Sequence, residues 1–144
     1  MAGFSKEARS RARELALQAI YQAQIAQHDT DELLRQFHER PDYEHVDRDY
    51  FDEVLTAVSG RADELAASLS EFADRPTGQL DPVELAILMI GYYELESRSD
   101  VPYKAIINEA VNLAKRFGAE DGHRYINAVL DRVANSLRQT EIAG

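Results

Sequence analysis

The chain has 144 residues, a formal net charge of −10 and no cysteine. This length fits one domain with a sizeable core, and the missing cysteines exclude disulfides and thiolate metal sites. No apolar run approaches the 18 residues of a membrane span, and the charged N-terminal segment has no apolar core typical of a signal peptide, so we expect a cytoplasmic protein without contact to a membrane.

The charge is unevenly distributed along the sequence. Residues 26–100 carry 19 acidic and only 6 basic side chains, whereas residues 1–25 and 101–144 each have a small basic excess. An acidic chain is a poor nonspecific polyanion binder. A local basic site is still compatible with this composition, because charges separated by more than about 8 Å are largely screened.

The first half of the chain has helical periodicity. Ser5 can cap a helix that runs to about Gln27, and a shorter helix follows from about Thr30 to Glu39, ended by Pro41. Apolar residues then keep helical spacing in a stretch that begins at Asp47 or Val46 and runs to Leu69, and Gly60 is a point at which this stretch can divide.

The second half has two helix starts in which an acid is followed by proline. Asp81-Pro82-Val83-Glu84 places an acid at the N-cap, proline at the first position and glutamate at the third, and it opens a helix that is apolar almost all round. Asp100-Val101-Pro102 opens the next helix, residues 103–117. Gly118 is the expected C-cap of that helix, and Asp121 is expected to cap the last one.

We find no convincing strand pattern in the sequence. The predicted class is therefore all-α, a single domain over residues 1–144 with about seven helices.

Patterns that carry catalytic chemistry are missing. The four histidines lie in different segments, and none belongs to an HExxH pattern, so they are better interpreted as surface side chains. Gly118 and Gly122 lack the lysine and hydroxyl of a phosphate loop, and the acidic run at 44–53 lacks the spacing of a calcium loop. We predict a protein that is not an enzyme and needs no metal or cofactor.

The N-terminal segment SKEARSRARE is a candidate binding region. Lys6, Arg9 and Arg13 are three and four residues apart and share one helix face, while Arg11 points elsewhere. Arginine makes bidentate contacts to phosphate and stacks on bases. The alternative is an ordinary solvated face with Glu7 and Glu14 as partners.

The stretch FGAEDGHRYIN, residues 117–127, is a second candidate. A glycine-containing turn can bring two aromatic rings together beside three cations, namely Phe117 and Tyr125 with Lys115, Arg116 and Arg124. Aromatic rings beside arginines can bind unpaired bases, because the ring stacks on the base and the cation contacts the phosphate backbone of the nucleic acid. Asp121 either caps the helix or accepts from a base amino group. The alternative is that both rings belong to the core.

At these residues the sequence resembles the NusB family of bacterial transcription antitermination factors. The similar segments are RARELALQAIYQ (11–22), LDPVELAILMIGYYEL (80–95) and RSDVPYKAIINEAVNLAKRFGAEDGHRYINAVLD (98–131). The resemblance implies a fold of two small helical bundles packed together. It also implies binding of single-stranded boxA RNA from ribosomal RNA operon leaders, together with NusE, a small-subunit ribosomal protein. The pair then joins other Nus factors on RNA polymerase and suppresses premature termination.

The resemblance also assigns residues. Carried over by position, the family's RNA surface falls on Arg9, Arg11, Arg13, Tyr21, Phe117, Asp121 and Tyr125. Lys115, Arg116 and Arg124 are electrostatic additions to that surface. The NusE surface falls on Glu84 and other acids of the acidic middle segment, which would face basic side chains of the partner.

Four positions depart from the family pattern. Ser10 and Met89 stand where arginine is common, Gly122 replaces a frequent serine, and Ala128 stands where glycine is common. The basic arm is thinner as a result, and the cap of the last helix is weaker.

Two alternatives come from other functional classes. NusB-like domains also form the N-terminus of a ribosomal RNA cytosine methyltransferase, but 144 residues leave no space for its cofactor-binding domain. The third hypothesis is an interaction module that acts as a homodimer through apolar helix faces.

Overall fold

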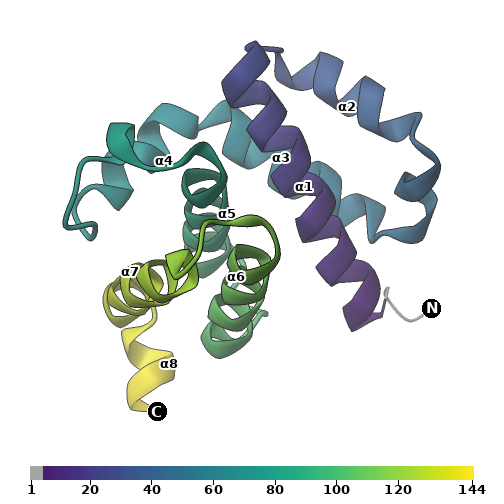
Figure 1. Cartoon of the computed structure of the whole chain (residues 1–144). Helices are drawn as coiled ribbons and strands as arrows, with labels where there is room; N and C mark the ends of the chain where they lie inside the picture. The colour runs from purple at the N-terminus through teal and green to yellow at the C-terminus, as the bar shows by residue number, and fades with distance from the viewer. Residues whose placement is uncertain (1–4) are drawn as a thin grey trace. The chain divides into compact units, whose positions relative to one another are not determined.

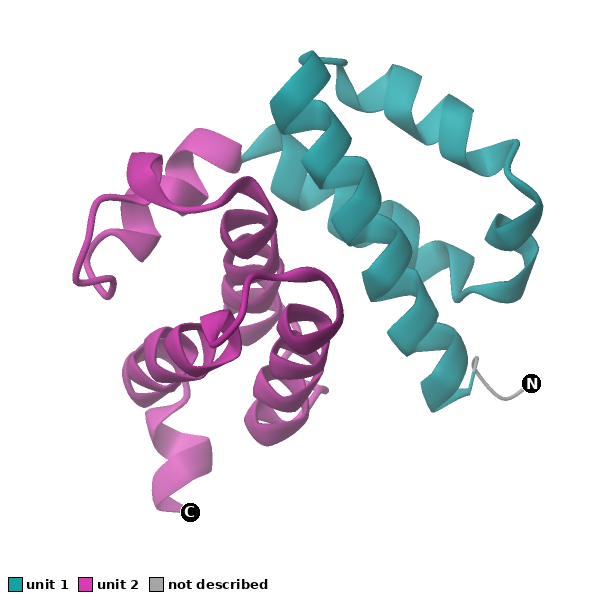
Figure 2. Cartoon of the chain, viewed as in Figure 1, with its two compact units in different colours: residues 1–61 teal, residues 62–144 magenta. Residues whose placement is uncertain are grey.

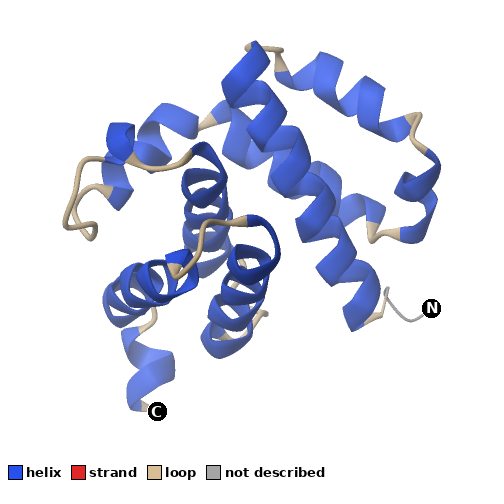
Figure 3. Ribbon diagram, in the orientation of Figure 1, coloured by secondary structure: helices blue, strands red, loops and turns tan. Residues whose placement is uncertain are grey.

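The computed structural model describes residues 5–144, and within that range every regular element is a helix (Figure 3). This confirms the predicted all-α class. The α-helices are α1 (Lys6–Ala26), α2 (Thr30–His38), α3 (Arg48–Gly60), α4 (Ala62–Leu69), α5 (Pro82–Ser97), α6 (Tyr103–Phe117), α7 (Gly122–Leu137) and α8 (Gln139–Ala143), with short 3-10 helices η1 (Pro41–His45) and η2 (Thr77–Gln79). Figure 1 shows their course along the chain. The division at Gly60 agrees with the sequence pattern, whereas α8 was not predicted.

The helices form two compact units, residues 1–61 and 62–144 (Figure 2). The first unit holds α1 to α3 and the second holds α4 to α8. Each unit has its own buried apolar residues, so each is a small helical bundle in its own right.

In the first unit, α3 packs against both α1 and α2. The helices begin where short polar side chains satisfy free backbone N–H groups: Ser5 accepts from Ala8 N at 3.1 Å, Asp29 from Glu32 N at 2.8 Å, and Asp47 from Tyr50 N at 3.1 Å. Such caps are worth about 1 kcal/mol each. Each cap joins residues only three positions apart, so the helix starts could be predicted from the sequence.

In the second unit, α5 packs against α4, α6 and α7. Its start is as predicted, since the Asp81 carboxylate accepts from Val83 N at 2.7 Å and Pro82 occupies the first turn. Gly91 allows α7 to come close, because a Cβ atom at this position would lie 2.8 Å from Leu130 Cδ1. The central position of α5 explains its apolar residues on every side.

The bounds of α6 are as predicted, but its start is not capped by the acid that precedes the proline. Asp100 forms an ion pair with Arg98, and the cap position belongs to Pro102, which has no side-chain acceptor. The Tyr103 N–H instead donates to Glu141 Oε2 of α8 at 3.0 Å. The cap thus comes from 38 residues away.

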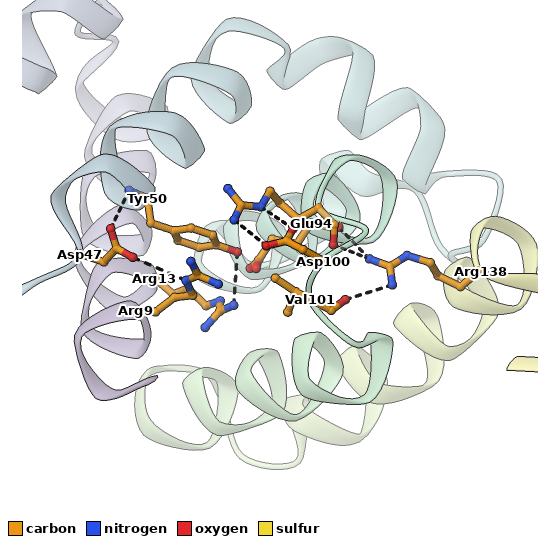
Figure 4. A network of polar contacts seen from close by, with 9 residues as sticks. Arg9, Arg13, Asp47, Tyr50, Glu94, Asp100, Val101 and Arg138 are labelled. Atoms are coloured by element: carbon orange, nitrogen blue, oxygen red, sulfur yellow. Dashed lines mark hydrogen bonds and ion pairs between the residues drawn. The ribbon is translucent and has the colours of Figure 1, made fainter. Parts of the chain in front are cut away.

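Arg138 joins α8 to the rest of the second unit. Its buried guanidinium donates to the carbonyl oxygens of Leu95 (2.7 Å), Val101 (3.0 Å), Glu94 (3.2 Å) and Arg98 (2.9 Å), as Figure 4 shows in part. It also pairs with Glu141. One side chain therefore satisfies the C-terminal carbonyls of α5 and positions the carboxylate that caps α6.

Candidate nucleic-acid interface

The N-terminal group of predicted RNA-binding residues, Arg9, Arg11, Arg13 and Tyr21, lies on α1 of the first unit. Arg11 is exposed and makes no hydrogen bond or ion pair with any residue in the range 5–144. Tyr21 is 41% exposed. Both side chains are therefore accessible on the helix surface.

Arg9 and Arg13 differ from Arg11, because both turn toward Tyr50 of α3 (Figure 4). Their guanidinium carbons lie 4.4 and 5.1 Å from the centre of the Tyr50 ring, and Arg13 also donates to the Tyr50 hydroxyl at 3.2 Å. Arg9 faces Asp47 at 3.6 Å. Arg13 is only 4% exposed, so its guanidinium is part of the packing of α1 on α3.

The second group, Lys115, Arg116, Phe117, Asp121, Arg124 and Tyr125, surrounds the turn between α6 and α7 in the second unit. Phe117 is 40% exposed, and the Arg116 guanidinium lies 4.8 Å from its ring centre. Lys115 is exposed beside them. Gly118 permits this turn, because a Cβ atom here would lie 2.8 Å from the carbonyl oxygen of Ala114. The structure thus brings an exposed ring and the Arg116 guanidinium together, in the same helix turn as Lys115.

Asp121 stands at the cap position of α7 but does not act as a cap. Its backbone is left-handed, with φ of 63°, and its side chain accepts no hydrogen bond from the helix start. The carboxylate lies 3.8 Å from Arg124, and both side chains are largely exposed, at 69% and 78%. The prediction that Asp121 caps the helix is wrong, because the left-handed backbone replaces the extended conformation that an N-cap uses. Its carboxylate is left on the surface as an acceptor.

Tyr125 is half-buried, so it is neither the open ring of one interpretation nor the core ring of the other. Its hydroxyl is buried and has no hydrogen-bond partner within residues 5–144. The guanidinium of Arg75, from the segment between α4 and η2, lies 4.1 Å from its ring centre. Sequence reasoning missed Arg75, which stands 50 positions before Tyr125 in an unremarkable loop pattern.

Glu84, the predicted partner-binding acid, is 6% exposed in the first turn of α5. Its carboxylate lies against Gly122, where any Cβ atom would collide with Oε2. Gly122 therefore makes room for this side chain. Glu84 contacts the start of α7, next to the second group, and its predicted contact with a partner stays a prediction.

A polar cluster in the first unit is separate from both groups. His38 Nε2 lies 2.8 Å from Asp52, and the Tyr43 hydroxyl donates to the same carboxylate at 3.1 Å. Burial and the Asp52 charge raise the pKa of Tyr43 to about 12. Residues 5–144 contain no group of three or more side chains with the geometry of a metal site, and no helix among them is long and apolar enough to cross a bilayer.

The chain is similar to known proteins over most of its length. The NusB family model matches residues 10–135. The transcription antitermination protein NusB of Nitrosococcus oceani is 49% identical over 133 residues, which cover 92% of this chain and 89% of that protein. The protein of the same name from Hahella chejuensis is 47% identical over 137 residues, covering 95% and 92%.

A solved structure supports the fold. NusB of T. maritima superposes with a TM-score of 0.75 and covers 93% of both chains, at 22% sequence identity. This likeness concerns the fold alone. The family match and the identities above concern the sequence, and they agree with the resemblance found from its motifs and with a regulator that is not an enzyme. This chain therefore belongs to the NusB family.

Proposed function

We propose that this protein is a transcription antitermination factor that binds single-stranded boxA RNA of ribosomal RNA operon leaders together with NusE. It acts in the cytoplasm with other Nus factors on RNA polymerase. One observation carries the proposal. This chain of the NusB family has an exposed phenylalanine, three exposed cations and an aspartate that does not cap its helix, all within or next to one helix–helix turn.

The residues of this turn have different proposed roles in RNA binding. Phe117 offers a ring on which a base stacks, worth about 1–3 kcal/mol per base. Lys115, Arg116 and Arg124 offer positive charge to the phosphates. The Asp121 carboxylate makes no capping bond, so it is available to accept from a base amino group, a contact that reads sequence rather than backbone.

The first unit contributes a smaller set. Arg11 and Tyr21 are exposed on α1 and contact the RNA directly. Arg9 and Arg13 share the Tyr50 ring, so their charge acts through the potential near α1 more than through direct bonds. The first unit thus has proposed RNA contacts of its own.

NusE is the proposed protein partner. The acidic excess of residues 26–100 complements a basic partner, and such complementarity raises association rates and excludes wrong partners. Glu84 is the predicted contact within this acidic segment. Its low exposure means that the carboxylate must swing away from Gly122 to reach a partner side chain.

The test is fluorescence anisotropy of a short labelled boxA RNA, with the protein alone and with NusE, over a salt series. We expect sequence-selective binding that NusE strengthens, with a salt slope of about 0.7 per phosphate contact. Phe117→Ala should weaken binding at least about fivefold through the lost stack, without lowering the melting temperature.

Arg35→Ala is the matched control, because Arg35 is an exposed arginine outside both groups that forms a surface pair with Glu32. An RNA of scrambled sequence bound as tightly as boxA would contradict the proposal, and so would no binding in the presence of NusE.

A further inference from the structure

The most informative contact outside the predicted residues is the one between Arg75 and Tyr125. Arg75 is an exposed residue of the segment between α4 and η2, and its guanidinium carbon lies 4.1 Å from the centre of the Tyr125 ring. At this distance the planar guanidinium and the ring attract each other by a cation–π interaction. An arginine therefore occupies one face of the Tyr125 ring, which was predicted to bind RNA.

The segment that carries Arg75 is anchored along α7. Arg132, seven residues after Tyr125 on the same helix, donates to the carbonyl oxygen of Phe72, and the Phe72 ring lies 6.4 Å from that of Tyr92. Pro76 follows Arg75 directly, and a residue before proline is restricted to extended backbone. The chain is thus restrained three residues before Arg75 and directly after it.

The inner and outer sides of this pair have different environments. The Tyr125 hydroxyl is buried and has no hydrogen-bond partner in the described chain. Tyr125, on the inner side of the pair, therefore contributes by packing and not by hydrogen bonding. Arg75 as a residue is exposed, so its side chain can be reached from solvent. Nucleic-acid bases stack on arginine planes as they do on aromatic rings.

We propose that Arg75 and Tyr125 form a two-layer stacking platform, in which the guanidinium of Arg75 is the layer that meets an RNA base and Tyr125 is its support. The inference rests on the proposed function and refines it, because it moves the contact from Tyr125 to a residue in a different part of the sequence. The guanidinium already contacts the Tyr125 ring, so less side-chain freedom should be lost when the base binds. Phe117 is the second stacking position of the same turn.

The platform requires a planar group and not merely a charge, so the deciding variants are Arg75→Ala and Arg75→Lys. Both should weaken boxA RNA binding about tenfold in the anisotropy assay, because a lysine keeps the charge but offers no plane. The salt slope of Arg75→Lys should equal that of the wild type. Both variants should keep the wild-type melting temperature, since Arg75 is exposed.

A second measurement detects the stack itself. The Arg75 Nε–H resonance, assigned from its loss in Arg75→Lys, should shift when Tyr125 is replaced by leucine and should shift again when RNA is added. Tyr125→Phe keeps the ring and should bind RNA as the wild type does.

The outcomes separate the platform from the function on which it rests. If Arg75→Lys binds like the wild type, Arg75 is only a positive charge and the platform is overturned. If Phe117→Ala weakens binding while both Arg75 variants bind normally, the RNA function stands and the platform is wrong. If the wild type binds no boxA RNA even with NusE, both proposals are wrong.

Discussion

Each unit of the molecule places arginine over tyrosine, but the two pairings lie in different environments. In the first unit, Arg13 and Tyr50 are both buried, and the hydroxyl accepts a hydrogen bond from the guanidinium. In the second unit, Arg75 is exposed, and the Tyr125 hydroxyl has no partner in the described chain. The same two residue types therefore stabilise a helix contact in one place and leave a cation open to solvent in the other. Burial, and not residue type, separates a structural arginine from one available to a ligand.

The largest expected difference is in the stability effect of removing each arginine. Arg13→Met should lower the free energy of unfolding by about 2–3 kcal/mol, because it removes a buried charge-assisted hydrogen bond and leaves the Tyr50 hydroxyl without that donor. Arg75→Met should change it by less than about 0.5 kcal/mol, as expected for an exposed site. Urea unfolding followed by circular dichroism measures both. Equal effects of the two substitutions would contradict the comparison.

A smaller and sharper difference concerns the two hydroxyl groups. Tyr50→Phe should destabilise the protein by about 1–2 kcal/mol, because Arg13 loses an acceptor inside the protein. The identical change at Tyr125 should be neutral or stabilising by up to about 1 kcal/mol, because that hydroxyl is buried without a partner in the described chain. Thermal melts of the two single variants and of the double variant show whether the effects have opposite sign and add. A destabilising Tyr125→Phe would mean that the hydroxyl has a partner after all.

The smallest expected effects concern the pH dependence of stability, which should differ between the two units. The Tyr103 N–H and the Arg138 guanidinium lower the pKa of Glu141 in the second unit. Its contribution to stability is complete above the ordinary pKa of 4.5 and is lost as the pH falls below it. In the first unit the raised pKa of Tyr43 gives a contribution that is complete below pH 10 and lost as the pH rises toward 12.

The variants Glu141→Gln and Tyr43→Phe test these two windows. Each should flatten the pH dependence of the melting temperature on its own side, acid for Glu141 and alkaline for Tyr43. A Glu141→Gln variant with an unchanged acid limb would show that the cap of α6 does not depend on the charge.

Features set by neighbouring residues could be predicted from the sequence. The starts at Asp29, Asp47 and Asp81 follow from a side chain that reaches two or three residues ahead, and that geometry is present in any sequence with the same spacing. The family resemblance was carried in the same way by a long continuous segment near the C-terminus. The NusB family membership and the all-helical class therefore agreed with the prediction. The exposure of Phe117 agreed with one of the two interpretations of its ring.

Features set by distant residues could not be predicted. The acceptor for Tyr103 N–H is Glu141 and not the nearby Asp100, because the C-terminal helix places a carboxylate at the start of α6. Arg13 lies on the predicted cationic face of α1, yet Tyr50 supplies a ring and an acceptor that bury it. The pairing of Arg75 with Tyr125 joins residues 50 positions apart, which no local pattern encodes. In each case a partner distant in the sequence determines the contacts or the burial of a charged side chain.

The contact between Glu84 and Gly122 makes the effects of substitution at these two positions interdependent. A Cβ atom at position 122 would meet Glu84 Oε2, the far end of a flexible side chain, so a serine there turns the carboxylate aside. The same substitution displaces no carboxylate once position 84 carries a shorter side chain. Each position therefore determines what a substitution at the other does to the protein surface at the start of α7.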